Sequence, residues 1–216
     1  MSGFEVRNAA GAITVNSDYK SPLLASSAAV STGTVGDFDL NIPDFGNLNQ
    51  LGYVLDDNLY SPGQLAWFRL NVNGWGVPGA RYFLPGSVFI AKTKIDLSVE
   101  SGYLDVFNAE GALIWSAKSA ANMPRVLGFI TIPPNYDLQN NTLTTGVSGT
   151  PFYLMDIIPG ALAEDQEGVG AKNGIVMKQQ SGSVILRYIN QNGKNYVNTP
   201  LYSRGFKIPY AVFPTI

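Results

Sequence analysis

The chain has neither cysteine nor histidine among its 216 residues. Without cysteine it can form neither a disulfide framework nor a thiolate metal site. Without histidine it lacks the commonest general base of enzymes and the commonest metal ligand. We therefore expect no metal, no cofactor and no catalytic residue, and we do not expect the protein to be an enzyme.

Charge is scarce as well. Charged residues make up 14% of the chain, against about 25% in a typical soluble domain. The net charge is −2 and no cluster of Lys and Arg is present, so nucleic-acid binding is not expected. The 11 Tyr, 11 Phe and 3 Trp fit either a large core or a surface covered by partners, because interface cores are poor in charge and rich in aromatic residues.

Long apolar runs are also missing. No run approaches the roughly 18 residues of a membrane-spanning helix, so no membrane insertion is expected. The first residues, Met-Ser-Gly-Phe-Glu, have neither a basic region nor an apolar region of the secretory kind. We expect synthesis and folding in a cytoplasm.

Short apolar runs separated by Gly, Pro and Asn fill the chain instead. Residues 64–72, 126–132, 152–158 and 183–189 are examples, and each is bounded by turn residues. No amphipathic helix of more than about ten residues emerges. This pattern predicts an all-β fold, an antiparallel β-sandwich-like arrangement of about twelve to fifteen strands.

One motif occurs twice. Residues 3–17 alternate in the manner of a β-hairpin, with a turn that opens at Asn8 and closes at Gly11. Residues 106–116 repeat residues 6–16 with five of eleven positions identical. We therefore predict equivalent hairpin turns in which Gly11 and Gly111 both have positive φ.

The pattern divides the chain into three segments. Residues 1–20 are the N-terminal β-hairpin, residues 21–48 an extended charge-poor arm with a first strand, and residues 49–216 the main β domain. The repeated hairpin leaves open whether the main part consists of two related β halves, the second beginning near residue 102.

Two segments are candidates for assembly. Residues 21–36 carry no charge and are rich in Ser, Ala, Thr and Gly, which fits either a linker or an arm lying along a neighbouring subunit. The apolar C-terminus, residues 210–216, should pack in the core or on a neighbour. The predicted assembly residues are Leu23, Leu24, Val30, Tyr210, Val212, Phe213 and Ile216.

Other motifs that suggest chemistry are weaker. Asp56 with Asp57, and the acidic residues 164–167, are paired carboxylates by type only, and each fits a turn or a solvated loop. The glycine-rich residues 168–174 match no phosphate-loop spacing. Trp75, in a Gly-rich turn, is the one tryptophan that we consider for ligand contact, whereas Trp67 and Trp115 lie in predicted strands.

The opening hairpin resembles the start of a family of tailed-bacteriophage virion proteins found among tail-tip, baseplate and tail-fibre genes. The similarity rests on the pattern Gly3-Phe4-Glu5-Val6-Arg7-Asn8-x-x-Gly11-x-Ile13 and covers roughly the first twenty residues, with an echo at residues 106–116. The resemblance implies a structural protein of a phage tail or baseplate, located in the virion and assembled in the host cytoplasm.

Two functions follow as expectations. The first is a virion structural protein that forms homo-oligomers and binds other virion proteins through assembly interfaces. The alternative is a β module of a tail fibre that binds a carbohydrate or receptor on the host surface.

Overall fold

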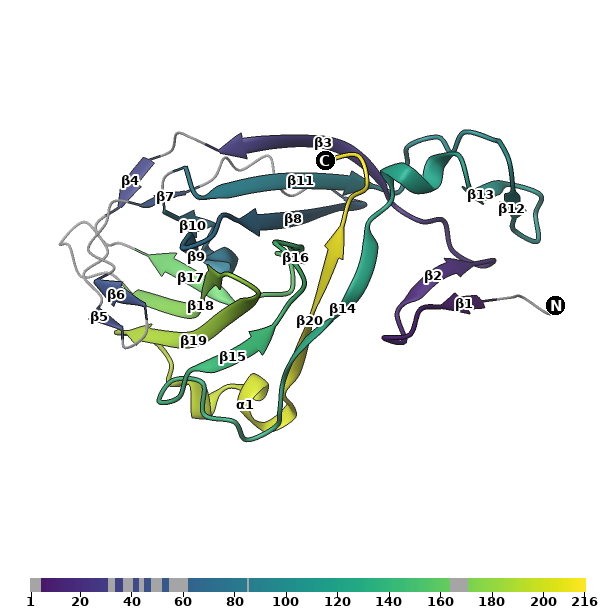
Figure 1. Ribbon diagram of the computed structural model, residues 1–216. Coiled ribbons are helices and arrows are strands. Elements are labelled where there is room, and N and C mark those ends of the chain that lie inside the picture. The colour runs from purple at the N-terminus through teal and green to yellow at the C-terminus, as the bar shows by residue number, and fades with distance from the viewer. Residues whose placement is uncertain are drawn as a thin grey trace.

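The computed structural model describes residues 5–30, 34–36, 41–42, 45–47, 52–54, 62–84, 86–163 and 171–216 (Figure 1). Antiparallel strands dominate this part of the chain, and its helical structure is limited to α1 (Pro200–Arg204) and short 3-10 turns. The predicted all-β, sandwich-like fold is confirmed. Several strands, such as β5 (Asn41–Ile42) and β6 (Gly46–Asn47), are only two residues long.

The first large sheet has six strands in the order β14-β20-β16-β8-β11-β3. All neighbours in it are antiparallel. Its strands are β3 (Leu23–Val30), β8 (Gln64–Leu70), β11 (Val88–Lys94), β14 (Arg125–Ile132), β16 (Phe152–Leu154) and β20 (Phe206–Val212).

The second large sheet has eight strands. Its order is β15-β19-β18-β9-β10-β7-β4, and β17 also pairs with β18. Its strands are β4 (Thr34–Gly36), β7 (Gly52–Val54), β9 (Trp75–Val77), β10 (Tyr82–Phe83), β15 (Leu143–Gly146), β17 (Gly160–Ala163), β18 (Ala171–Gln180) and β19 (Ser183–Gln191).

The main core lies between these two sheets. Phe68 of β8 and Tyr153 of β16, from the six-stranded sheet, belong to one buried cluster with Met177 of β18 and Leu186 of β19 from the other sheet. Neighbouring residues point the other way, since Trp67 lies in a separate cluster on the outer face of the six-stranded sheet. This alternation is what a strand buried on both faces requires.

The strand order of the six-stranded sheet reads the same from either edge. Residues 1–101 contribute three strands to this sheet. From the outer edge inward they are β3, β11 and β8, so in the sequence the outermost is the first of the three, the next is the last, and the innermost is the middle one. The chain after residue 102 contributes the other three strands. From the opposite edge inward they are β14, β20 and β16, which again are the first, the last and the middle of the three in the sequence. The eight-stranded sheet is divided the same way, with β15 to β19 on one side and β4 to β10 on the other. The fold thus consists of two β halves with the same strand order in this sheet, and a hairpin precedes each half.

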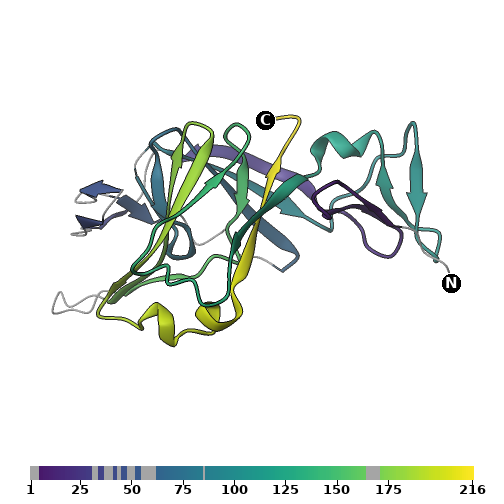
Figure 2. The ribbon, with the colours of Figure 1, turned by 60° about the horizontal axis from the view of Figure 1, so that its bottom comes forward.

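These hairpins lie outside both large sheets. Hairpin 1 pairs β1 (Glu5–Arg7) with β2 (Ile13–Asn16), and hairpin 2 pairs β12 (Asp105–Phe107) with β13 (Leu113–Ser116). Figures 1 and 2 show both hairpins at one end of the molecule, projecting from the two-sheet body.

The uncharged segment is part of the six-stranded sheet. Strand β3 pairs with β11 from Leu23 opposite Lys94 to Val30 opposite Val88. The linker interpretation of residues 21–36 is therefore wrong for residues 23–30, which belong to the six-stranded sheet of the body rather than to a separate arm. Residues 31–33 lie outside the described part of the chain.

The apolar C-terminus is likewise built into the body. Strand β20 lies between β14 and β16, and Phe213 packs edge-to-face against Phe152 with 5.0 Å between ring centroids. Of residues 210–216, Ala211 and Phe213 pack in the core, whereas residues 214–216 are exposed, so packing of these last residues on a neighbour stays a prediction.

Candidate functional site

The two hairpin turns have the same backbone. Gly11 has φ +78° and Gly111 φ +79°, so the prediction of positive φ at both glycines is confirmed. In hairpin 1 the Gly11 N–H donates to Asn8 O over 2.9 Å, and the Ala12 N–H donates to Asn8 Oδ1 over 3.0 Å. The first asparagine thus closes the turn with both its main chain and its side chain, which is the Asx pattern that favours Asn here.

Hairpin 2 repeats each of these bonds. The Gly111 N–H donates to Asn108 O over 3.0 Å, and the Ala112 N–H donates to Asn108 Oδ1 over 2.7 Å. The strand registers also correspond, because a bulge follows Val6 in one hairpin and Val106 in the other. The repeat in sequence is therefore a repeat of structure.

Hairpin 1 is attached to the body through its tip. The side-chain amide of Asn8 donates from Nδ2 to the main-chain oxygen of Val126 in β14 over 2.5 Å. Ala12, at the end of the turn, is only 6% exposed. The strands behind the tip are more open, since Glu5, Val6 and Arg7 are all exposed.

Hairpin 2 is attached in the opposite way, through its base. Val106, Ile114 and Ser116 are buried, whereas Ala112 in the turn is exposed. No hydrogen bond from the Asn108 side-chain amide nitrogen is present within the described residues. The same turn is therefore docked in one hairpin and free in the other.

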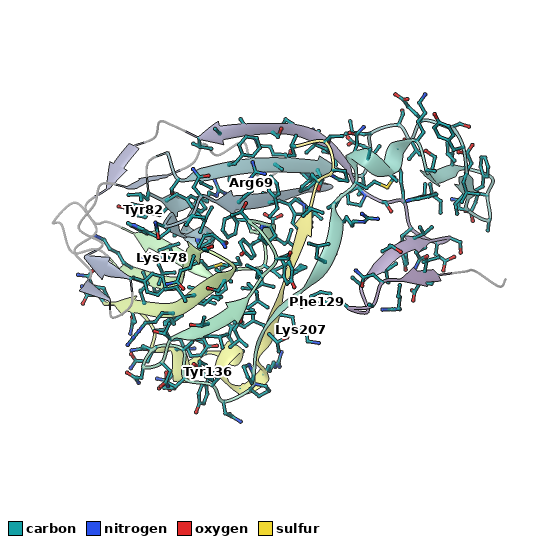
Figure 3. The ribbon with its side chains drawn as sticks, viewed as in Figure 1. Arg69, Tyr82, Phe129, Tyr136, Lys178 and Lys207 are labelled. Carbon is teal, nitrogen blue, oxygen red and sulfur yellow. The ribbon has the colours of Figure 1, made fainter. Side chains whose placement is uncertain are left out.

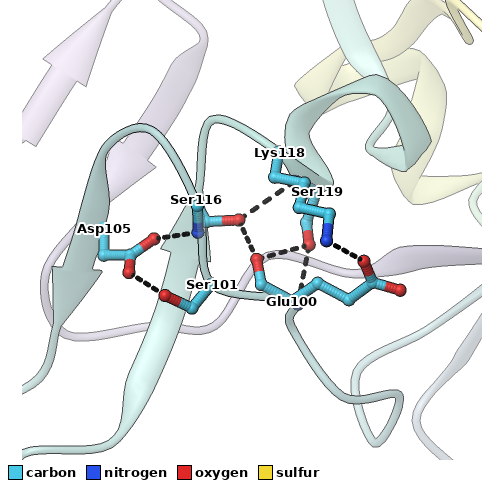
Figure 4. Close-up of polar contacts among 7 residues, drawn as sticks. Glu100, Ser101, Asp105, Ser116, Lys118 and Ser119 are labelled. Atoms are coloured by element: carbon cyan, nitrogen blue, oxygen red, sulfur yellow. Dashed lines mark hydrogen bonds and ion pairs between the residues drawn. The ribbon is translucent and has the colours of Figure 1, made fainter.

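A polar network fixes the base of hairpin 2 (Figure 4). Ser116 Oγ donates to the main-chain oxygen of Glu100 and accepts the Ser119 N–H over 3.0 Å. Ser119 Oγ in turn accepts the Glu100 N–H over 2.8 Å, and Lys118 Nζ lies 2.9 Å from Glu100 Oε2. This network holds the start and the end of the hairpin segment together.

The same network presents Tyr103 to solvent. Asp105 accepts hydrogen bonds from Ser101 Oγ and from the Gly102 N–H, and these bonds lower the pKa of the Asp105 carboxyl. Tyr103, inside this turn, has φ +66° and is 97% exposed. A tyrosine in the left-handed region is strained, and the described part of the chain leaves this side chain almost fully exposed.

Most of the exposed large apolar side chains lie on the two hairpin segments. They are Val6, Ile13 and Tyr19 around hairpin 1, and Ile95, Tyr103, Leu104 and Phe107 around hairpin 2. Exposed apolar residues that gather on one region mark an interaction surface. We call this region, residues 5–20 and 95–118, the hairpin face.

A cleft of about 410 Å³ lies where the hairpins meet the body. Its walls come from β2 of hairpin 1, from Trp115 of hairpin 2, from the 3-10 turn Ser119–Asn122 and from the start of β14. Pro214 of the C-terminus also lines it. The cleft is mainly apolar and belongs to the same end of the molecule as the hairpin face.

The structure corrects the ligand-contact prediction. Trp75 is 4% exposed and its ring packs on Tyr82 with 5.9 Å between centroids. It lies in strand β9 and in the cluster on the outer face of the eight-stranded sheet, so it is not available to a ligand. Trp67 is buried as expected.

The predicted assembly residues are spread through the body. Leu23 and Phe213 are buried within the chain itself, so their side chains are not free to meet a partner. Leu24, Val30, Tyr210 and Val212 are half-buried, and Ile216 is exposed. The location predicted for the interface is thus corrected for Leu23 and Phe213, because the fold uses both for its own packing.

The aromatic patch on the outer face of the six-stranded sheet has a structural explanation. Arg69, labelled in Figure 3, lies over the rings of Phe89 and Phe152, with its guanidinium carbon 4.8 and 4.7 Å from the two centroids. Burial lowers the pKa of Arg69. Figure 3 also shows Lys207 beside Phe129, and its Nζ lies 5.9 Å from that ring. These cation–π contacts cover apolar rings that would otherwise face water.

Groups suited to catalysis or metal binding do not gather in the described part of the chain. It contains no cluster of three or more acidic, His or Cys side chains that could hold a metal ion. Burial raises the pKa of Asp156, whose Oδ2 accepts the Ala66 N–H over 2.8 Å. The candidate carboxylates Asp56 and Asp57 and residues 164–167 lie outside the described residues, as do residues 168–170 of the glycine-rich segment. No helix in the described ranges is long and apolar enough to cross a membrane.

Two features were missed at the level of sequence. One is the free side-chain amide of Asn108. The sequence indicated this residue only as a second Asn at the start of a predicted turn. The other is Tyr103, whose signal was two large apolar residues, Tyr103 and Leu104, in a turn between Gly102 and Asp105.

Comparison with known proteins gives one match. No curated protein and no solved structure matches the chain. A family model described as a domain of unknown function, DUF8377, matches residues 1–215. The chain, with its two hairpins and two β halves, therefore belongs to the DUF8377 family.

Proposed function

We propose that this protein is a structural component of a tailed-bacteriophage virion, acting in the tail, baseplate or tail tip through protein–protein interfaces. The observation that carries the proposal is the hairpin face. Three of its exposed apolar side chains, Val6, Ile13 and Phe107, lie on two-stranded sheets, which are only marginally stable by themselves in water. A partner that covers the face would stabilise the hairpins and remove apolar area from water, at about 25 cal/mol per Å² before ordering costs.

Composition supports the same function. A low share of charged residues is typical of surfaces that are covered in an assembly. The hairpin motif with its Asn8 and Gly11 is also the part of the chain that resembles phage virion proteins. In the structure this motif projects from the body, where it can reach another subunit (Figure 1).

The sheet edges offer further assembly surface. Strand β3 is eight residues long, carries no charged residue and forms one edge of the six-stranded sheet. Such an edge is a template for pairing with another chain unless it is covered. An assembly that covers β3 would use the backbone of the uncharged segment, although its Leu23 side chain is buried.

Purified particles test the proposal. The phage that encodes this chain is purified on a density gradient, and the chain is quantified by mass spectrometry against a known capsid protein. We expect a fixed copy number per particle that survives high-salt washing. Absence of the chain from washed particles would refute the proposal.

One observation favours the alternative of a glycan- or receptor-binding tail-fibre module. Tyr103, Phe107 and Tyr19 are exposed aromatic side chains of the two hairpin segments, and aromatic rings can stack on sugars. Binding of the full-length chain to host cell-surface polysaccharide that is lost on Tyr103→Ala, without loss of the chain from particles, would favour this alternative.

A further inference from the structure

The contact between hairpin 1 and the body has two parts, which we call the tip and the socket. The tip is the turn from Asn8 to Ala12, which donates from Asn8 Nδ2 and buries Ala12. The socket is the start of edge strand β14, where Val126 O accepts the bond. A bulge marks the socket, because Leu127 has no partner in the pairing with β20.

The tip occurs a second time without a socket. Asn108 to Ala112 has the same turn as Asn8 to Ala12 and repeats three of its hydrogen bonds, whereas the bond from the Ala10 N–H to Asn8 Oδ1 has no counterpart within the described residues. Within the described residues its Asn108 Nδ2 donates to nothing, and Ala112 is exposed. One chain therefore carries one docked tip and one free tip.

The socket also occurs a second time without a tip. Strand β14 follows Pro124, and strand β3 follows Pro22. In β3 the residue left out of the pairing is Ala25, since Leu24 lies opposite Thr93 and Ser26 opposite Lys92. A proline, two paired residues and a bulged residue thus begin both edge strands.

The two sockets correspond in packing as well. Leu24 and Val126 are both half-buried and pack against the same apolar cluster on the outer face of the sheet. Ala25 and Ser26 are exposed, and no described strand pairs with the outer edge of β3. The 3-10 turn Ser119–Asn122 contacts β3, but no hairpin tip is bonded to the start of β3 in the way that hairpin 1 is bonded to the start of β14.

We propose that the free tip of hairpin 2 docks on the free socket at the start of β3 in a second copy of this chain. The proposal rests on the proposed assembly function and names its partner. The Asn108 amide donates to a main-chain oxygen at the start of the neighbour's β3, as Asn8 does to Val126 in its own chain. The neighbour's chain then covers Ala112 and the exposed Phe107, which pairs with Leu113 next to it.

Charge favours a second copy as the occupant. The hairpin 2 segment, residues 95–118, has one base, Lys118, against four acids: Asp96, Glu100, Asp105 and Glu110. Around the β3 socket, residues 18–30 and 88–94 have one acid, Asp18, against three bases: Lys20, Lys92 and Lys94. Lys94 lies directly opposite Leu23 at the start of β3. The tip and the socket are thus of opposite charge, which steers association and fixes orientation.

The chain cannot make this contact with itself in the observed fold. Hairpin 2 is fixed at its base by the network around Glu100 and Ser116, and its tip extends away from the body (Figure 1). A tip that meets a different surface on the next copy gives a head-to-tail contact. Such contacts close into rings or continue as filaments.

The first experiment removes the donor without breaking the turn. Asn108→Asp keeps the oxygen that accepts the Ala112 N–H and removes the amide donor. Sedimentation of the full-length wild type should show self-association, and Asn108→Asp should weaken it at least tenfold. The matched control is Asn198→Asp, which adds the same charge at an exposed residue of the 3-10 turn Tyr196–Asn198 and should leave association unchanged.

The second experiment identifies the contact surfaces. The chain has no native cysteine, so Ala112→Cys and Ala25→Cys each introduce a single thiol at an exposed residue. On mild oxidation, a mixture of the two variants should give several-fold more disulfide-linked dimer than either variant alone. A mixture of Ala112→Cys with Asn198→Cys serves as the control and should give only the background.

Three results would overturn the proposal. The first is a strictly monomeric wild type at high concentration, and the second is an association that Asn108→Asp leaves unchanged. The third is an intramolecular disulfide in a double variant that carries both Ala25→Cys and Ala112→Cys. These outcomes differ from failure of the proposed function, because a monomer found in washed particles leaves the virion function intact, and an oligomer missing from particles leaves self-association intact.

Discussion

The two hairpins have the same turn but opposite attachments. Hairpin 1 is docked through its tip, where Asn8 bonds to Val126, and its first strand is exposed. Hairpin 2 is anchored through its base, where Val106 and Ile114 are buried, and its tip is free. An identical local structure can thus be used once for folding and once for presenting a surface, and the rest of the chain decides which.

The largest expected difference lies in the anchors of the two hairpins. Ile114→Ala removes a buried side chain from the base of hairpin 2 and should lower the free energy of opening this hairpin by about 2–5 kcal/mol. Thr14→Ala changes the corresponding, half-buried position of hairpin 1 and should cost less than about 1 kcal/mol, since only a peripheral hydrogen bond to Val6 O is lost. Amide hydrogen exchange at Asn108 and Asn8 measures each opening.

A similar cost at both positions would show that the two bases are equally buried. The comparison between a base-anchored and a tip-anchored hairpin would then be wrong.

Replacement of the turn glycines should affect both hairpins. Gly11→Val and Gly111→Val each place a β-branched residue at positive φ, at a cost of about 1–3 kcal/mol. An added Cβ would meet no atom within 4 Å at either glycine, so the cost is conformational and should be similar in the two turns. Hydrogen exchange of the Ala12 and Ala112 amides reports the two values.

The matched controls are Gly11→Asn and Gly111→Asn, because Asn tolerates the left-handed region. They should cost clearly less than Val. Equal costs for Asn and Val would mean that backbone conformation is not the cause.

Much of this architecture could be predicted from the sequence. The alternation in residues 4–15 and its echo at residues 106–115 predicted both hairpins and both positive φ values, because turn chemistry is local. The strong strands β8 and β19 were also predictable, because both of their faces are apolar, and so was β14, because its residues 126–132 form a mainly apolar run that ends at Pro133. A local sequence pattern is enough to predict an element when only one local structure fits that pattern.

Other parts depend on tertiary contacts. Residues 73–79 suggested a turn because of their glycines, but Trp75–Val77 form strand β9. Gly76 is there because a Cβ would lie 2.2 Å from the Phe83 ring, so the glycine allows close packing rather than a turn. Strand β15, Leu143–Gly146, has no apolar run that would predict it from the sequence, because it is an edge strand with alternate residues exposed.

The docking of one tip and the freedom of the other could not be predicted. The two turns share Asn, Ala, Gly and Ala at corresponding positions, so no local pattern separates them. The difference arises because β14 passes beside the tip of hairpin 1, while hairpin 2 is fixed at its base by Ser116 and Ser119. Only the arrangement of distant segments contains that information.

A smaller difference should appear when the two asparagines are compared in the isolated chain. Asn8→Asp removes the donor to Val126 O and places a carboxylate beside a carbonyl oxygen, which should cost about 1–3 kcal/mol for docking of hairpin 1. Asn108→Asp removes no contact within the chain and should change the free energy of unfolding by less than about 0.5 kcal/mol. Urea unfolding of the two variants below their association concentration measures both. Equal destabilisation would mean that the tip of hairpin 2 is also docked within its own chain.

The smallest expected effect concerns the acidic residues at the start of each hairpin. Asp105 and Glu5 occupy corresponding positions, opposite Ser116 and Asn16, but their partners differ. Glu5 lies 2.5 Å from Arg7 in an exposed ion pair, which contributes little in water. Asp105 accepts bonds from Ser101 and the Gly102 N–H, and these lower its pKa.

The sign of the pH dependence follows from that shift. Because the pKa of Asp105 is lower in the folded chain than in the unfolded chain, its contribution to the Tyr103 turn is complete above the unfolded value and is lost as the pH falls through the folded value. Carbon-detected NMR titration should therefore give a lower pKa for Asp105 in the folded chain than in the urea-unfolded chain. Ser101→Ala should raise the pKa of Asp105, because it removes the largest cause of the shift, and should loosen the turn that holds Tyr103 at positive φ. If the titration of Asp105 does not respond to Ser101→Ala, the carboxylate does not hold this turn, and the rigid presentation of Tyr103 has another origin.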